Sequence, residues 1–411
     1  RQTTGQFYSR RFVMTYPNEQ LPAGRPLKKA PAWSEMNTAG AQWGCSWGLE
    51  VPLMFAGTGF AETPTLRRSN AFEVVAQECK TVREAVGLLD ISGFSRYEIT
   101  GPNAEQWLRK LLAGRLPSEG RARLAPMLAP SGRLKGDLTI FNWGDGRWWL
   151  MGSYYLRNWH MRWFHDYRIE GVEVRDVSDT IVGFGLAGPK SREVLMALTH
   201  QDVSDKALPF MGCTTVDVGL IRAQVGRLSV CGELGYEINC SAAEHITLRQ
   251  MLLQAGADQG IQEFGFYAMN SLRLEKSFGI WNAEFTQDRT PGVTGLDRWI
   301  DWARDDFNGY GAALKEKSEG PIKQKLVTFE IDAEDADASG YEPVWQNDQR
   351  VGFVTSGGYG HYSQKSLAMG LLNVDVVETN GSLAIDVVGK RRGARVLNEP
   401  AWDPQGEKMR I

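Results

Sequence analysis

The sequence predicts an α+β protein in which an N-terminal arm precedes two related α+β units and a C-terminal β-barrel. Three observations predict this fold. A strand, a Gly-Pro turn and an amphipathic helix occur twice in the same order, only short β-like runs follow residue 325, and the first residues show little hydrophobic periodicity. The length of 411 residues fits two to three domains of about 150 residues. The expected segments are 1–69, 70–175, 176–320 and 321–411.

Residues 1–69 are rich in glycine, proline and polar side chains, although several tryptophans give them apolar surface. We expect an ordered arm that lies over another part of the molecule. The first α+β unit is expected to begin with a helix at Asn70, because Asn70 and Glu73 have the N-cap and N3 spacing of a capping box. Apolar residues then recur at helical intervals as far as residue 89.

The two α+β units are predicted from an internal repeat. The segment "YEITGPNAEQWLRKLL" resembles "FGLAGPKSREVLMAL", and their turn glycines, Gly101 and Gly188, are 87 residues apart. Hairpin-like strands follow each helix, and further helices are expected at about 242–254 and 266–278. Two copies of one strand and helix pattern predict two related units, the second of which carries the connecting helix.

The last segment, 321–411, changes character. The runs "KLVTFEI", "RVGFVTS", "SLAMGLLNV" and "SLAIDVVG" are short and β-like, and Asn380-Gly381 between two of them is typical of a tight hairpin. These features predict a small all-β barrel or sandwich, and we expect the barrel.

The composition excludes several classes of function. A formal net charge of -3, from 46 basic and 49 acidic residues, gives no reason to expect a nucleic-acid partner. No apolar run approaches the 18 residues of a membrane helix, so no membrane association is expected. The chain begins at Arg1 without an apolar signal core, and its five cysteines form no CxxC pair. We expect a cytoplasmic location, or the mitochondrial matrix if the source is eukaryotic.

No metal site is expected, because His160 and His165 are five residues apart and do not share a helical face. The sequence also has no nucleophile elbow, phosphate-binding loop, dinucleotide fingerprint or zinc-protease motif. Any chemistry must therefore depend on individual polar residues in their local setting.

Asp137 is the first such residue, in "SGRLKGDLTIF", where a glycine-rich turn enters an apolar strand. Strand alternation places it on the face opposite to Leu138. A carboxylate beside apolar residues has a raised pKa and is suited to accept or position a proton. The alternative interpretation is that Asp137 caps the turn that precedes it.

Glu233 lies in "CGELGYE" between Gly232 and Gly235, where the backbone is able to approach a ligand closely. Its carboxylate can accept two parallel hydrogen bonds from an amidine-like edge. The alternative is an ordinary hairpin turn. Arg273, in "SLRLEK", is a candidate for binding an anionic tail, and a structural ion pair is the equally supported alternative.

Several motifs together resemble the glycine cleavage T-protein (aminomethyltransferase) superfamily. The similarity is closest to the folate-binding C-terminal half of dimethylglycine and sarcosine dehydrogenases, and it covers nearly the whole chain. It is carried by "REAVGLLDISGFSRYEITGP", "GRLKGDLT", "GLAGPKSREVL", "GELGYEI", "FGFYAMNSLRLEKSFGIW" and "VTSGGYGHYSQKSLAMG". The chain departs from the family pattern at four positions: Val230, Cys231, Val293 and Arg298.

The resemblance implies a cloverleaf of two ferredoxin-like units and a barrel around a central hole for tetrahydrofolate. Asp137 would be the essential aspartate beside the reacting folate nitrogen. Glu233, with Gly232 and Tyr236 of the same motif, would hold the pterin edge, and Arg273 would belong to the folate site.

The implied reaction is capture of a methylene unit from the iminium of an oxidised N-methyl amine, of the dimethylglycine or sarcosine type, to give 5,10-methylenetetrahydrofolate. No GxGxxG segment is present, so FAD is expected only in a separate or upstream dehydrogenase domain or subunit, which would be the partner. Two alternatives remain open: a stand-alone aminomethyltransferase or demethylase of the glycine-cleavage type, and a non-catalytic folate-binding subunit.

Overall fold

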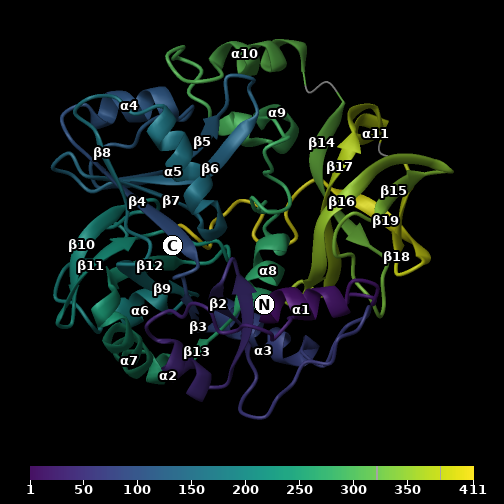
Figure 1. Cartoon of the computed structure of the whole chain (residues 1–411), viewed down its shortest axis with the longest axis horizontal. Helices are drawn as coiled ribbons and strands as arrows, with labels where there is room; N and C mark the ends of the chain where they lie inside the picture. Colours follow the sequence, from purple (N-terminus) through teal and green to yellow (C-terminus); the bar gives the residue numbers. More distant parts are fainter. Residues whose placement is uncertain (321–322, 380) are drawn as a thin grey trace.

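The computed structural model describes residues 1–320, 323–379 and 381–411. It contains two antiparallel-rich sheets with helices, a closed six-stranded barrel and an N-terminal arm. Figure 1 shows the two sheets stacked on one side of the molecule and the barrel on the other. The predicted α+β class with a C-terminal barrel is therefore confirmed.

The first sheet has five strands in the order β5-β6-β7-β4-β8. Apolar side chains on its outer face pack with helices α4 and α5 around Trp107, Leu138 and Phe164. Its elements are β4 (Phe94–Thr100), α4 (Ala104–Leu111), β5 (Arg121–Leu128), β6 (Leu134–Asn142), β7 (Trp148–Ser153), η1 (Tyr154–Leu156), α5 (Arg157–Asp166) and β8 (Glu173–Asp176).

The second sheet has six strands in the order β10-β11-β12-β9-β3-β13. Helices α6 and α7 cover its outer face, where Leu195 and Leu248 pack with Phe184. Its elements are α3 (Phe72–Glu84), β3 (Val86–Asp90), β9 (Ile181–Ala187), α6 (Ser191–Met196), β10 (Cys213–Val218), β11 (Ile221–Gly226), β12 (Gly235–Ser241), η2 (Ala242–Glu244), α7 (His245–Ala255), η3 (Ala257–Gln259) and β13 (Ile261–Glu263).

The strands of the first sheet lie within residues 94–176 and those of the second within 181–263, with the exception of β3. Strand β3 falls in the expected first unit, yet it pairs antiparallel with β9 and parallel with β13 in the second sheet. It takes the position that β8 occupies beside β4 in the first sheet. This exchange depends on pairing between distant strands, which local sequence patterns do not report.

The internal repeat is visible in the structure, because β4–α4 and β9–α6 occupy matching positions in the two sheets. Gly101 and Gly188 end these strands with φ of +111° and +134°. A Cβ atom would lie 2.3 Å from the Gly171 carbonyl oxygen at the first position and 2.5 Å from the Ala85 carbonyl oxygen at the second. Both turns therefore require glycine, for backbone conformation and for space.

The inner faces of the two sheets contact each other. Phe141 on β6, Trp149 on β7 and Cys213 on β10 belong to one apolar cluster. The Arg96 Nε atom on β4 donates a hydrogen bond of 2.8 Å to the side-chain oxygen of Asn239 on β12. The layers thus run helix, sheet, sheet, helix, and the inner faces enclose a shared interior.

The barrel closes in the strand order β14-β17-β16-β15-β18-β19. Asn380 of the expected Asn380-Gly381 hairpin lies outside the described residues. The hairpin prediction is wrong for the flanking strands, because β17 and β18 are separated by helix α11 and pair with other strands. The barrel elements are β14 (Gln324–Ile331), β15 (Pro343–Gln346), β16 (Gln349–Gly360), β17 (Lys365–Asn373), α11 (Val374–Thr379), β18 (Leu383–Val387) and β19 (Lys390–Leu397).

Short helices connect the second sheet to the barrel, and α8 packs against strands β16 and β17 through Leu274, Leu367 and Met369. The expected helix at 266–278 is confirmed as α8, which is slightly shorter. These elements are α8 (Phe266–Glu275), α9 (Pro291–Thr294), η4 (Leu296–Trp299) and α10 (Tyr310–Glu319). No helix in the described parts of the chain is long and apolar enough to cross a membrane.

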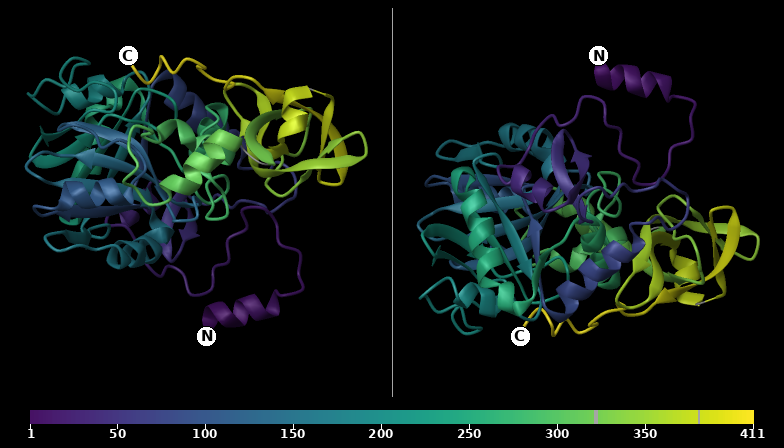
Figure 2. Two further views of the ribbon diagram at one scale, coloured as in Figure 1. Left: turned by 90° about the horizontal axis from the view of Figure 1, so that it is seen from above. Right: turned by 90° about the horizontal axis from the view of Figure 1, so that it is seen from below.

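The N-terminal arm, residues 1–69, contains a few regular elements separated by irregular segments. It contains α1 (Gln2–Ser9), α2 (Trp33–Thr38) and a hairpin of β1 (Ala41–Ser46) and β2 (Leu49–Phe55). Met36 is fully buried against the second sheet, whereas α1 buries no residue and stands away from the body (Figure 2). The expected capping box at Asn70 does not form, because α3 begins at Phe72 and the Asn70 side chain binds the preceding loop.

Candidate functional site

Strand β6 directs Asp137 into the interior between the two sheets. Leu138 and Ile140 belong to the outer core of the first sheet, and Phe141 belongs to the cluster between the sheets. Alternation along the strand gives Asp137 the same face as Phe141, as the sequence predicts.

The Asp137 carboxylate has an unusual setting. It is half-buried, and within the described chain no other residue donates a hydrogen bond to it. Burial raises its pKa to about 7, and its own backbone amide opposes this shift only partly. Asp137 also affects a tyrosine: burial and the negative charge of Asp137 both raise the pKa of Tyr155. Asp137 is therefore able to exchange a proton near neutral pH.

A second carboxylate occupies the inner face of the second sheet. Tyr236 and Ile238 on β12 point into the outer core, so alternation turns Glu237 toward the first sheet together with Asn239. Burial raises the pKa of Glu237 to about 7, against the attraction of the Arg96 guanidinium. Its Oε2 atom is buried and has no hydrogen-bond partner among the described residues. Such an orphaned oxygen is suited to a ligand that donates N–H groups.

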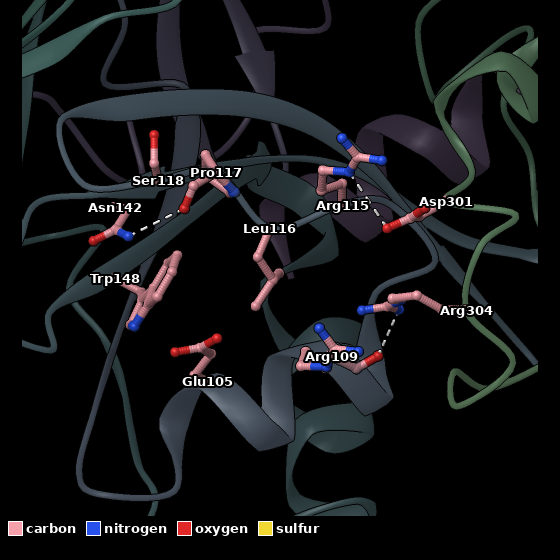
Figure 3. A pocket seen from close by; sticks show the side chains of 10 residues that line it. All are labelled: Glu105, Arg109, Arg115, Leu116, Pro117, Ser118, Asn142, Trp148, Asp301 and Arg304. Atoms are coloured by element: carbon pink, nitrogen blue, oxygen red, sulfur yellow. Dashed lines mark hydrogen bonds and ion pairs between the residues drawn. The ribbon is translucent and has the colours of Figure 1, made fainter.

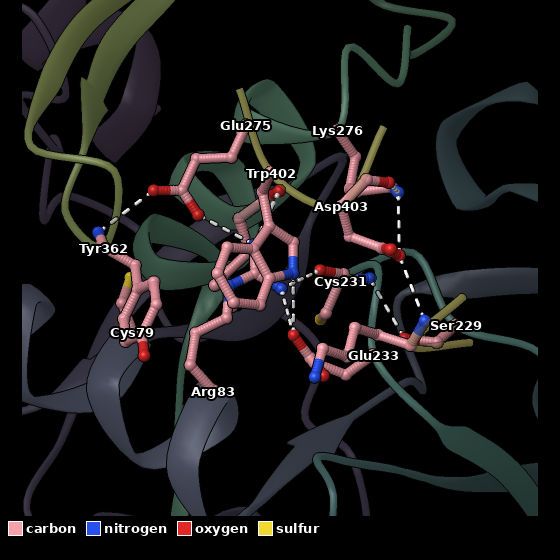
Figure 4. A network of polar contacts seen from close by, with 12 residues as sticks. Cys79, Arg83, Ser229, Cys231, Glu233, Glu275, Lys276, Tyr362, Trp402 and Asp403 are labelled. Carbon is pink, nitrogen blue, oxygen red and sulfur yellow. Dashed lines mark hydrogen bonds and ion pairs between the residues drawn. The ribbon is translucent and has the colours of Figure 1, made fainter. Parts of the chain in front are cut away.

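Glu233 lies in a different environment, four residues earlier. Its Oε1 atom accepts hydrogen bonds of 2.8 Å from Arg83 Nη1 and from the Trp402 indole nitrogen. Arg83 also donates to Glu275 at 2.7 Å, and its guanidinium carbon is 4.7 Å from the centre of the Trp402 ring (Figure 4). Arg83, Glu233 and Glu275 are almost completely buried. Together with Trp402, these three residues are called the Arg83 network.

Arg273 is 1% exposed, and protein groups occupy its donors. Its Nη2 atom donates to Asn270 at 2.7 Å and to Ser356 at 2.9 Å, while Nη1 forms an ion pair of 3.3 Å with Glu284. Burial lowers its pKa, and Glu284 opposes the shift. These contacts join α8 to the barrel strand β16 and favour the structural alternative for this arginine.

The two remaining predicted residues also contact protein. Gly232 has φ of +78°, and a Cβ atom there would lie 2.3 Å from the Lys276 side chain. The Tyr236 hydroxyl accepts a hydrogen bond of 3.1 Å from Arg192 on the outer side of the sheet. Cys231 is buried, and burial raises the pKa of its thiol to about 12, so it is a packing residue.

Of the five predicted site residues, only Asp137 lies on the interior face with unfilled hydrogen-bonding capacity. The structure does not bring the Glu233 carboxylate to that face, because the Arg83 network holds it. The sequence analysis did not single out Glu237, although alternation through "GYEINC" places it on the face opposite to the apolar Tyr236 and Ile238. Among the residues that the structure describes, no group of three potential metal ligands occurs.

Comparisons with known families cover most of the chain. The model of the GCVT N-terminal domain matches residues 33–304, and that of the glycine cleavage T-protein C-terminal barrel domain matches residues 324–403. The crystal structure of glycine cleavage system aminomethyltransferase T from Bartonella henselae superimposes with a TM-score of 0.80 at 23% identity, over 92% of this chain and 99% of that one. This likeness confirms the fold.

Curated relatives fall into two groups by length. Dimethylglycine dehydrogenase of Rattus norvegicus is 32% identical over 94% of this chain and 46% of the relative. The 4-methylaminobutanoate oxidase (formaldehyde-forming) of Paenarthrobacter nicotinovorans is 28% identical over 99% of this chain and 50% of the relative. An aminomethyltransferase of a Geobacillus strain is 27% identical over 92% of this chain and 99% of the relative. The chain spans about half the length of the two larger relatives.

Proposed function

The chain belongs to the glycine cleavage T-protein family of aminomethyltransferase-like enzymes, and from that premise we propose that it is a tetrahydrofolate-dependent one-carbon transferase module. It captures the methylene unit of an oxidised N-methyl amine, of the dimethylglycine or sarcosine type, as 5,10-methylenetetrahydrofolate. The oxidation itself belongs to a flavin dehydrogenase domain or subunit.

One observation carries the proposal: two carboxylates with unfilled hydrogen-bonding capacity lie on facing sheets, and burial raises the pKa of each to about 7. Reduced folate offers a guanidine-like ring edge and secondary amines, which are N–H donors. We assign the ring edge to Glu237, because its Oε2 atom lacks a partner. We assign the reacting amine to Asp137. Glu233, Gly232, Tyr236 and Arg273 then support the site from outside it.

In the proposed reaction the iminium carbon forms bonds to two amine nitrogens of the folate and loses its double bond to the substrate nitrogen. Two N–H protons leave the folate in this exchange; one departs with the released amine and the other goes to solvent. Asp137 accepts a proton from the attacking nitrogen and holds it for transfer to the departing amine. Its carboxylate also attracts the cationic carbon fragment, and the enclosing sheets exclude water that would hydrolyse the iminium.

The flavin partner is proposed from the names and lengths of the relatives. The dehydrogenase and oxidase are about twice as long as the region they share with this chain. We propose that the rest of such proteins carries the flavin-dependent oxidation of the amine. The iminium that this oxidation forms then passes to the site at Asp137.

The experiment couples the purified chain to a flavin amine oxidase that converts sarcosine, in the presence of tetrahydrofolate, and measures methylenetetrahydrofolate and formaldehyde. We expect Asp137→Asn to lower the rate of methylenetetrahydrofolate formation by at least about 100-fold, with formaldehyde released instead. The control is Asp217→Asn, an exposed aspartate on β10. The proposal fails if the intact chain does not bind tetrahydrofolate, or if both variants have the same activity.

A stand-alone aminomethyltransferase is the second candidate, favoured by the match over 99% of the Geobacillus aminomethyltransferase. It predicts methylenetetrahydrofolate formation from an aminomethylated carrier protein with no flavin enzyme present. A non-catalytic folate-binding subunit predicts that folate binds and that Asp137→Asn changes no rate.

A further inference from the structure

A pocket separate from the candidate site lies on the helix-covered side of the first sheet (Figure 3). It has a volume of about 360 Å³ and is formed by α4, the loop that follows it, the neighbouring ends of β6 and β7, and the segment around residues 301–304. Asp137 does not line it. The pocket includes Asn142 and Trp148, and Trp148 belongs to the outer core rather than to the interior between the sheets.

Arg304 provides the main reason to expect a ligand. Its side chain is 7% exposed, and its Nη2 atom donates to the carbonyl oxygens of Arg109 at 2.9 Å and Leu112 at 2.8 Å. These bonds fix the guanidinium against the end of α4. Its Nη1 atom is buried and has no hydrogen-bond partner within the described chain. An unfilled donor on a buried guanidinium is costly unless a ligand or water completes it.

Two further arginines, Arg109 and Arg115, line the same pocket from α4 and its following loop. The ion pairs available to the three arginines are long: Arg115 to Asp301 at 3.5 Å, and Arg109 and Arg304 to a shared Asp306 at 3.3 Å. Burial lowers the pKa of Arg304 and the charge of Arg109 lowers it further, whereas the charges of Asp306 and Asp301 oppose the shift. The positive charge is therefore compensated incompletely, which favours an additional carboxylate.

The pocket also has a negatively charged residue, Glu105. Figure 3 shows Glu105 and Trp148 on one side of Leu116, and the three arginines on the other. Glu105 lies in the first turn of α4, is exposed, and has no ion pair among the described residues. A carboxylate without an ion pair in the described chain, one helical turn from Arg109, disfavours a phosphate dianion and favours a ligand that also carries a cation.

We propose that this pocket binds a free amino acid as its zwitterion, with the carboxylate on Arg304 and Arg109 and the ammonium group facing Glu105. The ligand joins α4 to the segment that carries Asp301 and Arg304, so it binds the folded chain in preference to the unfolded chain. This site is independent of the proposed one-carbon chemistry, because it lies on the outer face of the first sheet.

The test titrates the whole chain at low salt with glycine, L-alanine and L-glutamine, and with propionate, methylammonium and inorganic phosphate, by calorimetry and by saturation-transfer NMR. We expect at least one amino acid to bind about tenfold more tightly than propionate, and phosphate and methylammonium to bind no better than propionate. The proposal is overturned if no amino acid binds, or if phosphate binds as tightly as the best of them.

Two variants in the pocket and two outside it locate the binding. Glu105→Gln is expected to weaken amino-acid binding about tenfold and to leave propionate unchanged, while Arg304→Lys weakens both. The matched control is Glu193→Gln, since Glu193 occupies the first turn of α6, the counterpart of α4 in the repeat. Repeating the titration in Asp137→Asn separates this pocket from the candidate site, because pocket binding is unchanged there. Wild-type affinity in both pocket variants rules out the assignment.

Discussion

Glu233 and Glu237 are four residues apart in one motif and lie in opposite chemical settings. Glu233 is ion-paired with Arg83 at 2.8 Å and accepts a hydrogen bond from Trp402, within the Arg83 network. Glu237 lies between the sheets with a buried oxygen that has no partner in the described chain. Their difference shows that two glutamates of one short motif can have entirely different hydrogen-bonding environments.

The difference also suggests a criterion: whether protein groups fill the hydrogen-bonding capacity of a buried charge distinguishes a structural role from a chemical one. A buried charge whose partners are all protein groups stabilises one arrangement of the chain. A buried carboxylate without a partner destabilises the fold and is retained where a ligand completes it. The following predictions test this distinction between the Arg83 network and the Asp137 and Glu237 pair.

The largest effect is expected when the Arg83 network loses its cation. Arg83→Met leaves Glu233 and Glu275 buried without a partner, which should cost about 3–5 kcal/mol of unfolding free energy, measured by urea denaturation. Arg222→Met, at an exposed position on β11, is the control and should change stability by less than about 0.5 kcal/mol. Equal losses in the two variants would contradict a structural role for the network.

The second prediction compares two variants, in which either Glu237 or Glu233 is replaced by glutamine. Glu237→Gln should weaken tetrahydrofolate binding by about 2 kcal/mol, or about 30-fold, because a neutral amide replaces the unpaired carboxylate. Its melting temperature should not fall. Glu233→Gln should lower the melting temperature and leave the affinity within about threefold. Calorimetric titration and thermal unfolding of both variants check this, and the reverse pattern would return the ligand role to Glu233.

The third prediction concerns pH. The folded-state pKa of Asp137 is raised to about 7 from the ordinary value of 3.8, so the folded chain keeps a proton that the unfolded chain loses. Its contribution to stability is therefore lost as pH rises from about 4 to 7. Asp137→Asn should stabilise the chain at pH 8 by on the order of 2 kcal/mol and leave it unchanged below pH 4. Thermal unfolding across this range gives the measurement; a pH-independent difference would argue against the shift.

The smallest effect is expected at the edge of the Arg83 network. Trp402→Phe removes the indole N–H bond to Glu233 and keeps a ring over Arg83, so unfolding should become easier by about 1 kcal/mol. Trp345→Phe is a matched control, because the Trp345 indole also donates to a carboxylate, that of the half-buried Asp386 on the barrel surface. A loss as large in the control would remove the distinction between buried and surface bonds.

Local periodicity predicted the parts of the site that depend on one strand or one turn. Alternation in β6 predicted the face of Asp137, and the paired Gly-Pro turns predicted the repeat that Gly101 and Gly188 complete. The same alternation in β12 predicts the face on which Glu237 lies. The sequence analysis selected Glu233 because two glycines, Gly232 and Gly235, lie close to it.

What the sequence did not predict depends on distant contacts. Arg83 meets Glu233 across 150 residues, and β3 joins the second sheet from within the expected first unit. Neither contact leaves a local pattern, because its energy arises only after the chain has folded. The pocket at Arg304 is of the same kind, since its charges come from segments about 190 residues apart.

The Arg83 network has a consequence for the order of biosynthesis. Its members come from α3, the "CGELGYE" turn, α8 and the segment after β19 that carries Trp402, so the network closes only after residues as far as Trp402 have left the ribosome. Until then Arg83 can pair with Glu233 and Glu275 through its two terminal nitrogens, but it lacks the indole ring that covers it. A chain in which Trp402 has not yet docked therefore leaves the guanidinium of Arg83 uncovered beside α3.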